Sequence, residues 1–137
     1  MATKKQWIHA QSVTVNTGTG ELHVHVGGEI TVKRAAISVA GNGDNELVGL
    51  VADTKIKVLA LCLIAAEAVT ATLYSGAQAT GTALTGAIPL AANGGFVLPA
   101  PADPDAHWLE TLAGKNLNLF LSAAKQVSGC LLYFEEA

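Results

Sequence analysis

The sequence predicts an all-β protein, a β-sandwich preceded by an N-terminal β-arm or meander. Three observations favour this fold class. Side chains alternate between apolar and polar along residues 55–64, 116–122 and 128–135, as they do in strands with one buried face. Small turn residues close these segments at the spacing of roughly 8 to 12 residues that is typical of sandwiches. Helix is almost absent from the pattern, since residues 65–68 suffice for one turn at most.

The first forty residues predict an arm of short strands. Three alternating segments are expected as strands, at 6–9, 12–16 and 21–26. The sequence TGTG at 17–20 suits a hairpin turn, because glycine accepts positive φ. Residues 29–40 predict a longer strand with a bulge or bend at 34–36. We therefore divide the chain into an arm over residues 1–40, which docks on the sandwich or on a neighbour, and a sandwich over residues 41–137, within one compact domain overall.

From residue 41 onward the pattern predicts the strands of the sandwich itself. They are expected at 46–51, 55–64, 69–75, 83–84, 88–90, 96–98, 117–122 and 127–135. Residues 41–45 predict a turn, and residues 114–116 predict the turn into a last hairpin formed by the final two strands. Residues 99–105 predict a stiff loop, because their three prolines lack the backbone donor. Trp108 is expected in the core, whereas Trp7 is expected at an interface.

The composition suits one compact domain with a substantial core, since 50% of 137 residues are hydrophobic and 14% are charged. Aromatic residues make up only 5%, so no stacking platform for single-stranded nucleic acid or sugars is expected. The net charge is −3, and the lysines and arginines are scattered rather than gathered in a basic stripe. Direct nucleic-acid binding is therefore not expected.

No membrane segment or signal peptide is expected. Residues 1–10 contain lysines but no apolar block behind them, and the longest apolar run, residues 58–66, is far shorter than the roughly 20 residues that cross a bilayer. The sequence thus predicts a protein made and kept in the cytosol. Cys62 and Cys130 lie within apolar strand patterns and are expected as free, buried thiols rather than as a disulfide.

The histidine pattern is the strongest metal signal, and it falls short of a site. His23 and His25 lie on the same face of one expected strand, about 7 Å apart. A metal site needs further ligands, and the other histidines, His9 and His107, lie in segments with no fixed register to this strand. We expect no metal ion and no cofactor.

Catalytic chemistry is not expected either. The chain has no Gly-x-Ser-x-Gly elbow, and neither cysteine lies in an electropositive setting. Asp103 and Asp105 flank Pro104 in the proline-rich loop, where solvated turn residues are the ordinary explanation, and Glu110 is the third carboxylate that a calcium site there would use. We predict that the protein is not an enzyme.

Several strand and turn segments resemble the jelly-roll module of small structural proteins of tailed phages and prophages, above all the cement (decoration) proteins of phage heads. These segments are GDNELV at 43–48, KIKVL at 55–59, VTATLYSG at 69–76, PLAANGG at 89–95 and SGCLLY at 128–133. They extend over most of the chain after residue 42. The resemblance rests on the residue patterns of strands and turns, and it includes no catalytic motif. The first forty residues lie outside it, where a docking arm specific to this protein is expected.

The resemblance implies a jelly-roll β-sandwich that decorates the outer surface of a phage head after synthesis in the bacterial cytoplasm. Its expected partner is the major capsid protein of an HK97-like shell, whose neighbouring subunits it bridges against the internal pressure of packaged DNA. The alternative is a jelly-roll module of a phage tail or baseplate that binds a host glycan or another tail protein.

Self-association is also expected, as a homodimer or alternatively a trimer. The candidate residues for capsid binding or self-association lie in the first strands, which are able to add to a neighbour's sheet edge. They are Trp7, Ile8, His9, Val13, Val15, Leu22, Val24 and Val26.

Overall fold

The computed structural model describes residues 12–15, 22–25 and 30–137. The chain forms two compact units, Met1–Thr31 and Val32–Ala137. In the first unit, β1 (Ser12–Val15) pairs with β2 (Leu22–His25) in a two-stranded antiparallel sheet, here called the N-terminal β-ribbon. The second unit is a β-sandwich, which confirms the fold class expected from the sequence.

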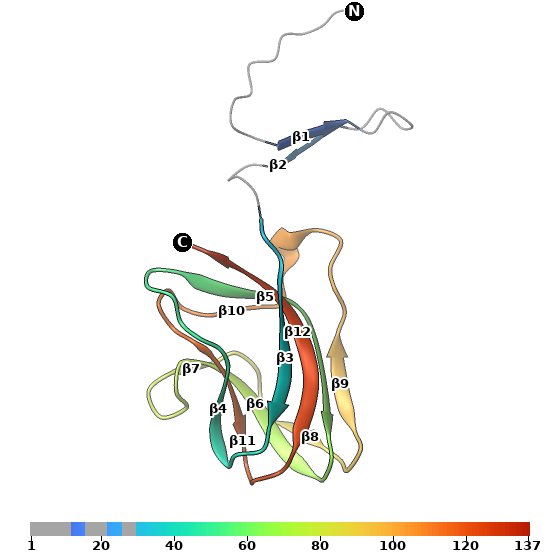
Figure 1. Cartoon of the computed structure of the whole chain (residues 1–137), viewed down its shortest axis with the longest axis vertical. Coiled ribbons are helices and arrows are strands. Elements are labelled where there is room, and N and C mark those ends of the chain that lie inside the picture. The colour runs from blue at the N-terminus through green and yellow to red at the C-terminus, as the bar shows by residue number, and fades with distance from the viewer. Residues whose placement is uncertain (1–11, 16–21, 26–29) are drawn as a thin grey trace, which may run out of the picture. The chain divides into compact units, whose positions relative to one another are not determined.

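Two antiparallel sheets build the sandwich (Figure 1). The first is called the β5–β12 sheet, and its strands in spatial order are β3 (Lys33–Val39), β12 (Val127–Glu136) and β5 (Lys55–Ala65), with β9 (Gly95–Leu98) and β10 (Leu109–Glu110) on the far side of β5. The second is called the β6–β11 sheet, and its strands in order are β4 (Gly43–Val48), β11 (Leu117–Leu121) and β6 (Val69–Ser75), with β7 (Thr82–Ala83) and β8 (Ile88–Leu90) on the far side of β6.

The order of these strands is that of a jelly roll. Along the chain, β3, β4, β5 and β6 alternate between the two sheets, and β11 and β12 again lie in opposite sheets. Each late strand inserts between two early ones, because β12 pairs with both β3 and β5 while β11 pairs with both β4 and β6. The two remaining positions are each filled by a pair of short strands, β7 with β8 and β9 with β10. This double-sheet arrangement joins every long strand to neighbours from distant parts of the sequence.

The jelly roll begins earlier in the chain than the sequence pattern indicated. We expected the arm to extend to residue 40, but β3 is an integral strand of the β5–β12 sheet and pairs with β12 from Lys33 to Val39. The division between the two units lies between Thr31 and Val32. A strand that pairs only with residues 88 or more positions later carries no local sign of its partner, which is why alternation alone assigned it to the arm.

Two other expectations need correction. Residues 117–122 and 127–135 do not form a hairpin, because β11 and β12 belong to different sheets and the connection between them crosses the sandwich. Residues 41–45 are not wholly a turn, because β4 begins at Gly43, opposite Leu121 of β11. Asn45 explains the turn-like composition, since its side-chain amide donates to the Gly41 carbonyl at 2.8 Å and shapes the chain just before the strand.

The core lies between the two sheets, where the alternation in the sequence directs the larger apolar side chains. In β5, Leu61 and Leu63 are almost fully buried, whereas Ile64 on the opposite face is 59% exposed. The same rule holds in β11, whose inward residues Leu117, Leu119 and Leu121 are fully buried.

Trp108 was expected in the core, but that expectation was wrong. It is 47% exposed beside the edge strand β10, and its indole nitrogen donates to the Pro99 carbonyl at 2.6 Å.

Candidate interaction surfaces

The N-terminal β-ribbon places four of the eight candidate interface residues on one face. Its register sets Val13 opposite Val24 and Val15 opposite Leu22. Directly opposed residues share a face, and residues two apart along a strand share it as well. The ribbon therefore has one face made of these four apolar positions.

The other face of the ribbon is polar. It is formed by Ser12, Thr14, His23 and His25, so the two histidines do share a face as the sequence predicted. His107 belongs to the second unit, while His9 lies outside the described residues. Trp7, Ile8 and Val26 also lie outside the described residues, and their assignment to an interface stays a prediction.

A second surface is the middle of the outer face of the β5–β12 sheet, where the residues are mostly small or apolar. One row crosses four strands in the order Ala36, Cys130, Cys62 and Val97. Val97 is 66% exposed. Between β9, β5 and β12 lies a shallow pocket of about 210 Å³, lined by Ala60, Leu61, Cys62, Val97, Leu98, Pro99, Cys130, Leu131 and Leu132. Each residue that lines this pocket has an apolar side chain or a thiol. Such residues are typical of protein–protein contact surfaces and not of acid–base catalytic sites.

The neighbouring rows of this outer face continue the same character. One contains Ser38, Ser128 and Ile64 together with Gly95, and the other contains Arg34, Leu132 and Ala60. Arg34 is the one charged residue in these three rows. The amino-acid sequence alone does not reveal this surface, because only the register brings residues from β3, β12, β5 and β9 together.

Cys62 and Cys130 meet in the middle of this surface. They are directly opposed on adjacent strands, and their sulfur atoms lie 3.7 Å apart as free thiols. Both were expected to be buried, but Cys130 is exposed and Cys62 is half-buried. Their shared hydrogen bond, reinforced by the charge of Cys62 and by burial, raises the pKa of the Cys130 thiol, while the nearby Arg34 charge acts in the opposite direction.

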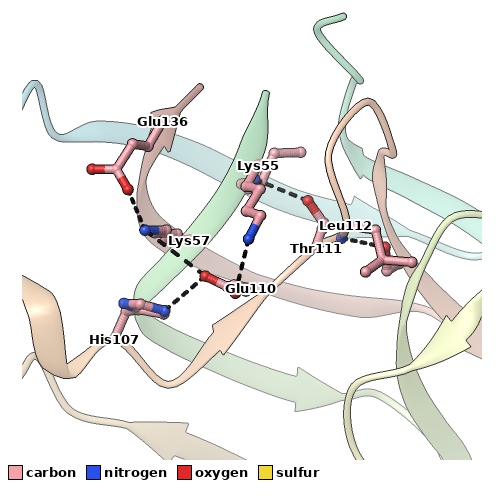
Figure 2. Close-up of polar contacts among 9 residues, drawn as sticks. Lys55, Lys57, His107, Glu110, Thr111, Leu112 and Glu136 are labelled. Atoms are coloured by element: carbon pink, nitrogen blue, oxygen red, sulfur yellow. Dashed lines mark hydrogen bonds and ion pairs between the residues drawn. The ribbon is translucent and has the colours of Figure 1, made fainter. Parts of the chain in front are cut away.

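A polar cluster ties β10 to β5 and β12 at one corner of the β5–β12 sheet (Figure 2). The Glu110 carboxylate lies 3.5 Å from the Lys55 ammonium, 3.8 Å from that of Lys57 and 3.3 Å from His107 Nε2. Lys57 also pairs with Glu136 of β12. The Glu110 carboxylate therefore meets three cationic or donor groups, which suits a structural ion network better than a general base.

The Lys57 and His107 side chains of this cluster also contact an aromatic ring, that of Phe134. The Lys57 ammonium lies 5.7 Å from the centre of the Phe134 ring, and the His107 ring lies nearly perpendicular to the same phenyl ring with the two ring centres 6.2 Å apart. His107 Nδ1 is buried and has no hydrogen-bond partner within residues 30–137 or the two described strands of the ribbon. No three metal-ligating side chains come together among the described residues, so His107 and Glu110 do not extend into a metal centre there.

Acidification tests the Lys57–Glu136 pair. The hydrogen bond from Lys57 and its positive charge lower the pKa of Glu136 below its ordinary value. Such a carboxyl stabilises the fold above its unfolded-state pKa, and this contribution is lost as the pH falls through the folded-state value. The Glu136 side chain is 52% exposed, which keeps the contribution small. We expect Glu136→Gln to lower the unfolding free energy by less than about 1 kcal/mol near neutral pH and to match the wild type in acid below that pKa, as measured by urea denaturation across pH.

Two buried hydroxyl groups join the end of β10 to both sheets. Thr111 is 1% exposed, and its hydroxyl accepts the Ile56 amide of β5 at 2.9 Å (Figure 2). Ser75 of β6 is equally buried, and its hydroxyl accepts the Leu112 amide at 2.9 Å. These bonds link the two sheets at this end of the sandwich.

Replacing the Thr111 hydroxyl by a methyl group tests this link. Thr111→Val keeps the shape of the side chain but removes the acceptor of the buried Ile56 amide. An unsatisfied buried amide costs about 1 to 3 kcal/mol, so we expect this loss in the unfolding free energy from urea denaturation. Thr82→Val in the exposed strand β7 is the matched control and is expected to change stability by less than about 0.5 kcal/mol. Equal effects of the two substitutions would contradict the link.

Two further carboxylates, Asp103 and Asp44, accept backbone amides. Asp103 Oδ1 accepts the Asp105 amide at 2.9 Å and caps η1 (Pro104–Ala106), a single helical turn in the loop expected to be stiff. Asp44 of β4 instead accepts the amide of the distant residue Gln78 at 3.0 Å. No helix among the described residues is long and apolar enough to cross a membrane.

Comparison with known proteins finds no family model that matches this sequence and no curated protein that is significantly similar to it.

Proposed function

We propose that this protein is a non-enzymatic decoration (cement) protein of a tailed-phage head. In this role it binds the outer surface of the shell, bridges neighbouring major capsid subunits and stabilises the shell against the pressure of packaged DNA. The observation that carries the proposal is a separate two-stranded unit with one apolar face, joined to a jelly roll. The resemblance of the sequence after residue 42 to phage decoration modules supplies the biological setting.

We infer that the N-terminal β-ribbon packs against the surface of a partner. A sheet of two strands is marginally stable in water by itself, and the register of the ribbon places four apolar residues at positions of one face, Val13, Val15, Leu22 and Val24. Docking of this face on a capsid subunit or on a second copy would bury it. Pairing of a ribbon edge with a neighbour's sheet adds backbone hydrogen bonds to that contact.

The jelly roll suits the role of a rigid bridging body. Its two sheets enclose a continuous apolar core, and its long strands pair with partners far away in the sequence. The outer face of the β5–β12 sheet offers small and apolar side chains with Arg34 as the one charge in its three central rows. Depletion of charge in this way is typical of the centre of protein interfaces.

The repeated geometry of a shell supplies the strength that one contact lacks. A standard interface buries roughly 1,600 Å², and a protein that engages two subunits at once gains further through its high effective local concentration. A homodimer would place two N-terminal β-ribbons across a two-fold axis, and a trimer would serve three-fold positions. In either assembly, the shell is stabilised by many modest contacts and not by a chemical reaction.

Co-sedimentation tests the proposed role. The purified chain is mixed with expanded, undecorated heads of the phage that encodes it, and bound copies per major capsid subunit are counted. We expect saturation at one simple fixed ratio, with no binding to purified tails. Absence of binding to heads, or saturable binding to tails or baseplates instead, would overturn the proposal and favour the tail module.

Removal of the first unit shows whether the N-terminal β-ribbon or the jelly roll makes the contact with the head. Residues 32–137 form a compact unit of their own, so the chain without residues 1–31 is expected to fold. We expect this truncated chain to lose at least about tenfold in affinity for heads, which corresponds to about 1.4 kcal/mol of binding free energy. Unchanged head binding, together with an unchanged oligomeric state in sedimentation velocity, would place the contact on the jelly roll alone.

A further inference from the structure

Two thiols face each other across the two central strands of the β5–β12 sheet. Cys62 of β5 and Cys130 of β12 are directly opposed in the antiparallel register, and their sulfur atoms lie 3.7 Å apart. Neither belongs to the β-ribbon or to the polar cluster around Glu110. The structure leaves both as free thiols.

We propose that Cys62 and Cys130 are an oxidation site that forms an intramolecular, cross-strand disulfide when the chain meets a low-molecular-weight disulfide. The inference goes beyond the proposed function, and it holds whether or not the protein decorates a phage head. In a reducing cytosol the pair stays as thiols, whereas outside the cell the disulfide is the favoured state.

The backbone already satisfies the main geometric requirement. Directly opposed residues of antiparallel strands have Cα atoms about 4.5 to 5.5 Å apart, which lies inside the range of about 4.4 to 6.8 Å that disulfides span. The sulfur atoms must then approach from 3.7 Å to the bond length of about 2.05 Å. Rotation of the two side chains supplies this movement, because both strands remain in register on either side of the pair.

The surroundings leave the pair open to a small oxidant. Cys130 is exposed and Cys62 is half-buried. The other members of their row are Ala36, whose side chain is a single methyl group, and the exposed Val97. Cys130 is therefore the thiol that the oxidant reaches first, and Cys62 is the thiol that resolves the intermediate.

The reaction is a pair of thiol–disulfide exchanges. The Cys130 thiolate attacks one sulfur of oxidised glutathione, which forms a mixed disulfide and releases one glutathione thiolate. The Cys62 thiolate then attacks the Cys130 sulfur and expels the second glutathione. The two cysteines lose two protons and two electrons, and these end on the two molecules of reduced glutathione.

The rate of the first exchange should rise with pH. The hydrogen bond and charge of Cys62 raise the pKa of Cys130, so the thiolate is a minor form at neutral pH. Cys62 lies close to Cys130 and disfavours its thiolate. The same closeness makes the second exchange intramolecular and therefore fast. The mixed disulfide is therefore expected to be short-lived in the wild type.

The disulfide would lock the centre of the sheet. It joins positions 68 residues apart in the sequence and holds β5 to β12, so it restricts the unfolded chain strongly. We expect the oxidised protein to have a Tm about 5 to 15 °C above that of the reduced protein. This gain would come without a new contact between the two sheets of the sandwich.

Equilibration of the full chain with excess oxidised glutathione tests the proposal. We expect a product lighter by two hydrogen atoms in intact mass spectrometry, and one peptide pair joined through Cys62 and Cys130 after proteolysis without reductant. Calorimetry should show the higher Tm, reversed by reduction. The control variants Cys62→Ser and Cys130→Ser each keep one thiol and should take up one glutathione with no comparable rise in Tm.

Several results would overturn the proposal. One is a wild type that retains two free thiols, and another is a wild type that carries stable glutathione adducts on either cysteine. A third is a disulfide-linked dimer in place of the internal bond. An internal bond that leaves the Tm unchanged would overturn the locking of β5 to β12. None of these results depends on head binding, so the outcome is separate from the test of the proposed function.

Discussion

Two aspartates on the apolar face of the N-terminal β-ribbon should weaken binding to phage heads as much as removal of residues 1–31 does. The double variant Val13→Asp with Val24→Asp places like charges at directly opposed positions on the face that we assign to docking. Burying these carboxylates against a capsid subunit without partners costs several kcal/mol, which is more than one modest contact supplies. Co-sedimentation should show a loss of at least about tenfold in affinity, equivalent to about 1.4 kcal/mol and to the loss expected on removal of residues 1–31.

The opposite face of the same ribbon offers a matched control. Thr14→Asp with His23→Asp introduces the same two charges at another directly opposed pair, so any effect of charge repulsion on the ribbon itself is equal in the two variants. We expect this control to retain binding within a few-fold of the wild type. If both double variants lose binding equally, the apolar face is not the docking face and charge on the ribbon is the cause. If both bind normally, the ribbon takes no part.

Truncation of one core leucine should cost about 3 to 4 kcal/mol of unfolding free energy. Leu119 lies at the centre of β11, between β4 and β6, and is completely buried against the opposite sheet. Leu119→Ala removes most of its apolar contact and leaves a cavity in a tightly packed layer. Urea denaturation measures this loss directly, as a lower midpoint with an unchanged slope.

The same substitution at an exposed leucine calibrates that result. Leu112 is 55% exposed, and its backbone amide, which Leu112→Ala retains, makes the contact with Ser75. We expect this variant to lose less than about 0.5 kcal/mol. A cost at Leu119 no larger than that at Leu112 would contradict the core that the two sheets enclose.

Alternation of side chains predicted the strands well, because burial of one face imposes a period of two wherever it occurs. Residues 69–75 and 88–90 form β6 and β8 with the expected bounds, and the long strand expected at 55–64 forms β5. Local patterns identify a strand but not its partner. For this reason the sequence misassigned β3 to the arm and joined β11 and β12 in a hairpin.

The composition of each surface depends on which strands pair and in which register. Most of these surface features could therefore not be predicted from the sequence. Cys62 and Cys130 are far apart in the sequence, and no spacing rule places them side by side across β5 and β12. The network around Glu110 gathers side chains from three strands in the same way. The apolar face of the N-terminal β-ribbon was more accessible to prediction, because its residues alternate within two short segments that are close in the sequence.

Electron cryomicroscopy of heads saturated with the full chain would show directly whether the protein decorates the shell. We expect a jelly roll at fixed symmetry-related positions on the outer surface of the shell, across the joints between major capsid subunits. We also expect β1 and β2 to lie in the contact with a capsid subunit or with a second copy. A reconstruction that has no such density, or that places the jelly roll on the tail or baseplate, would rule out head decoration.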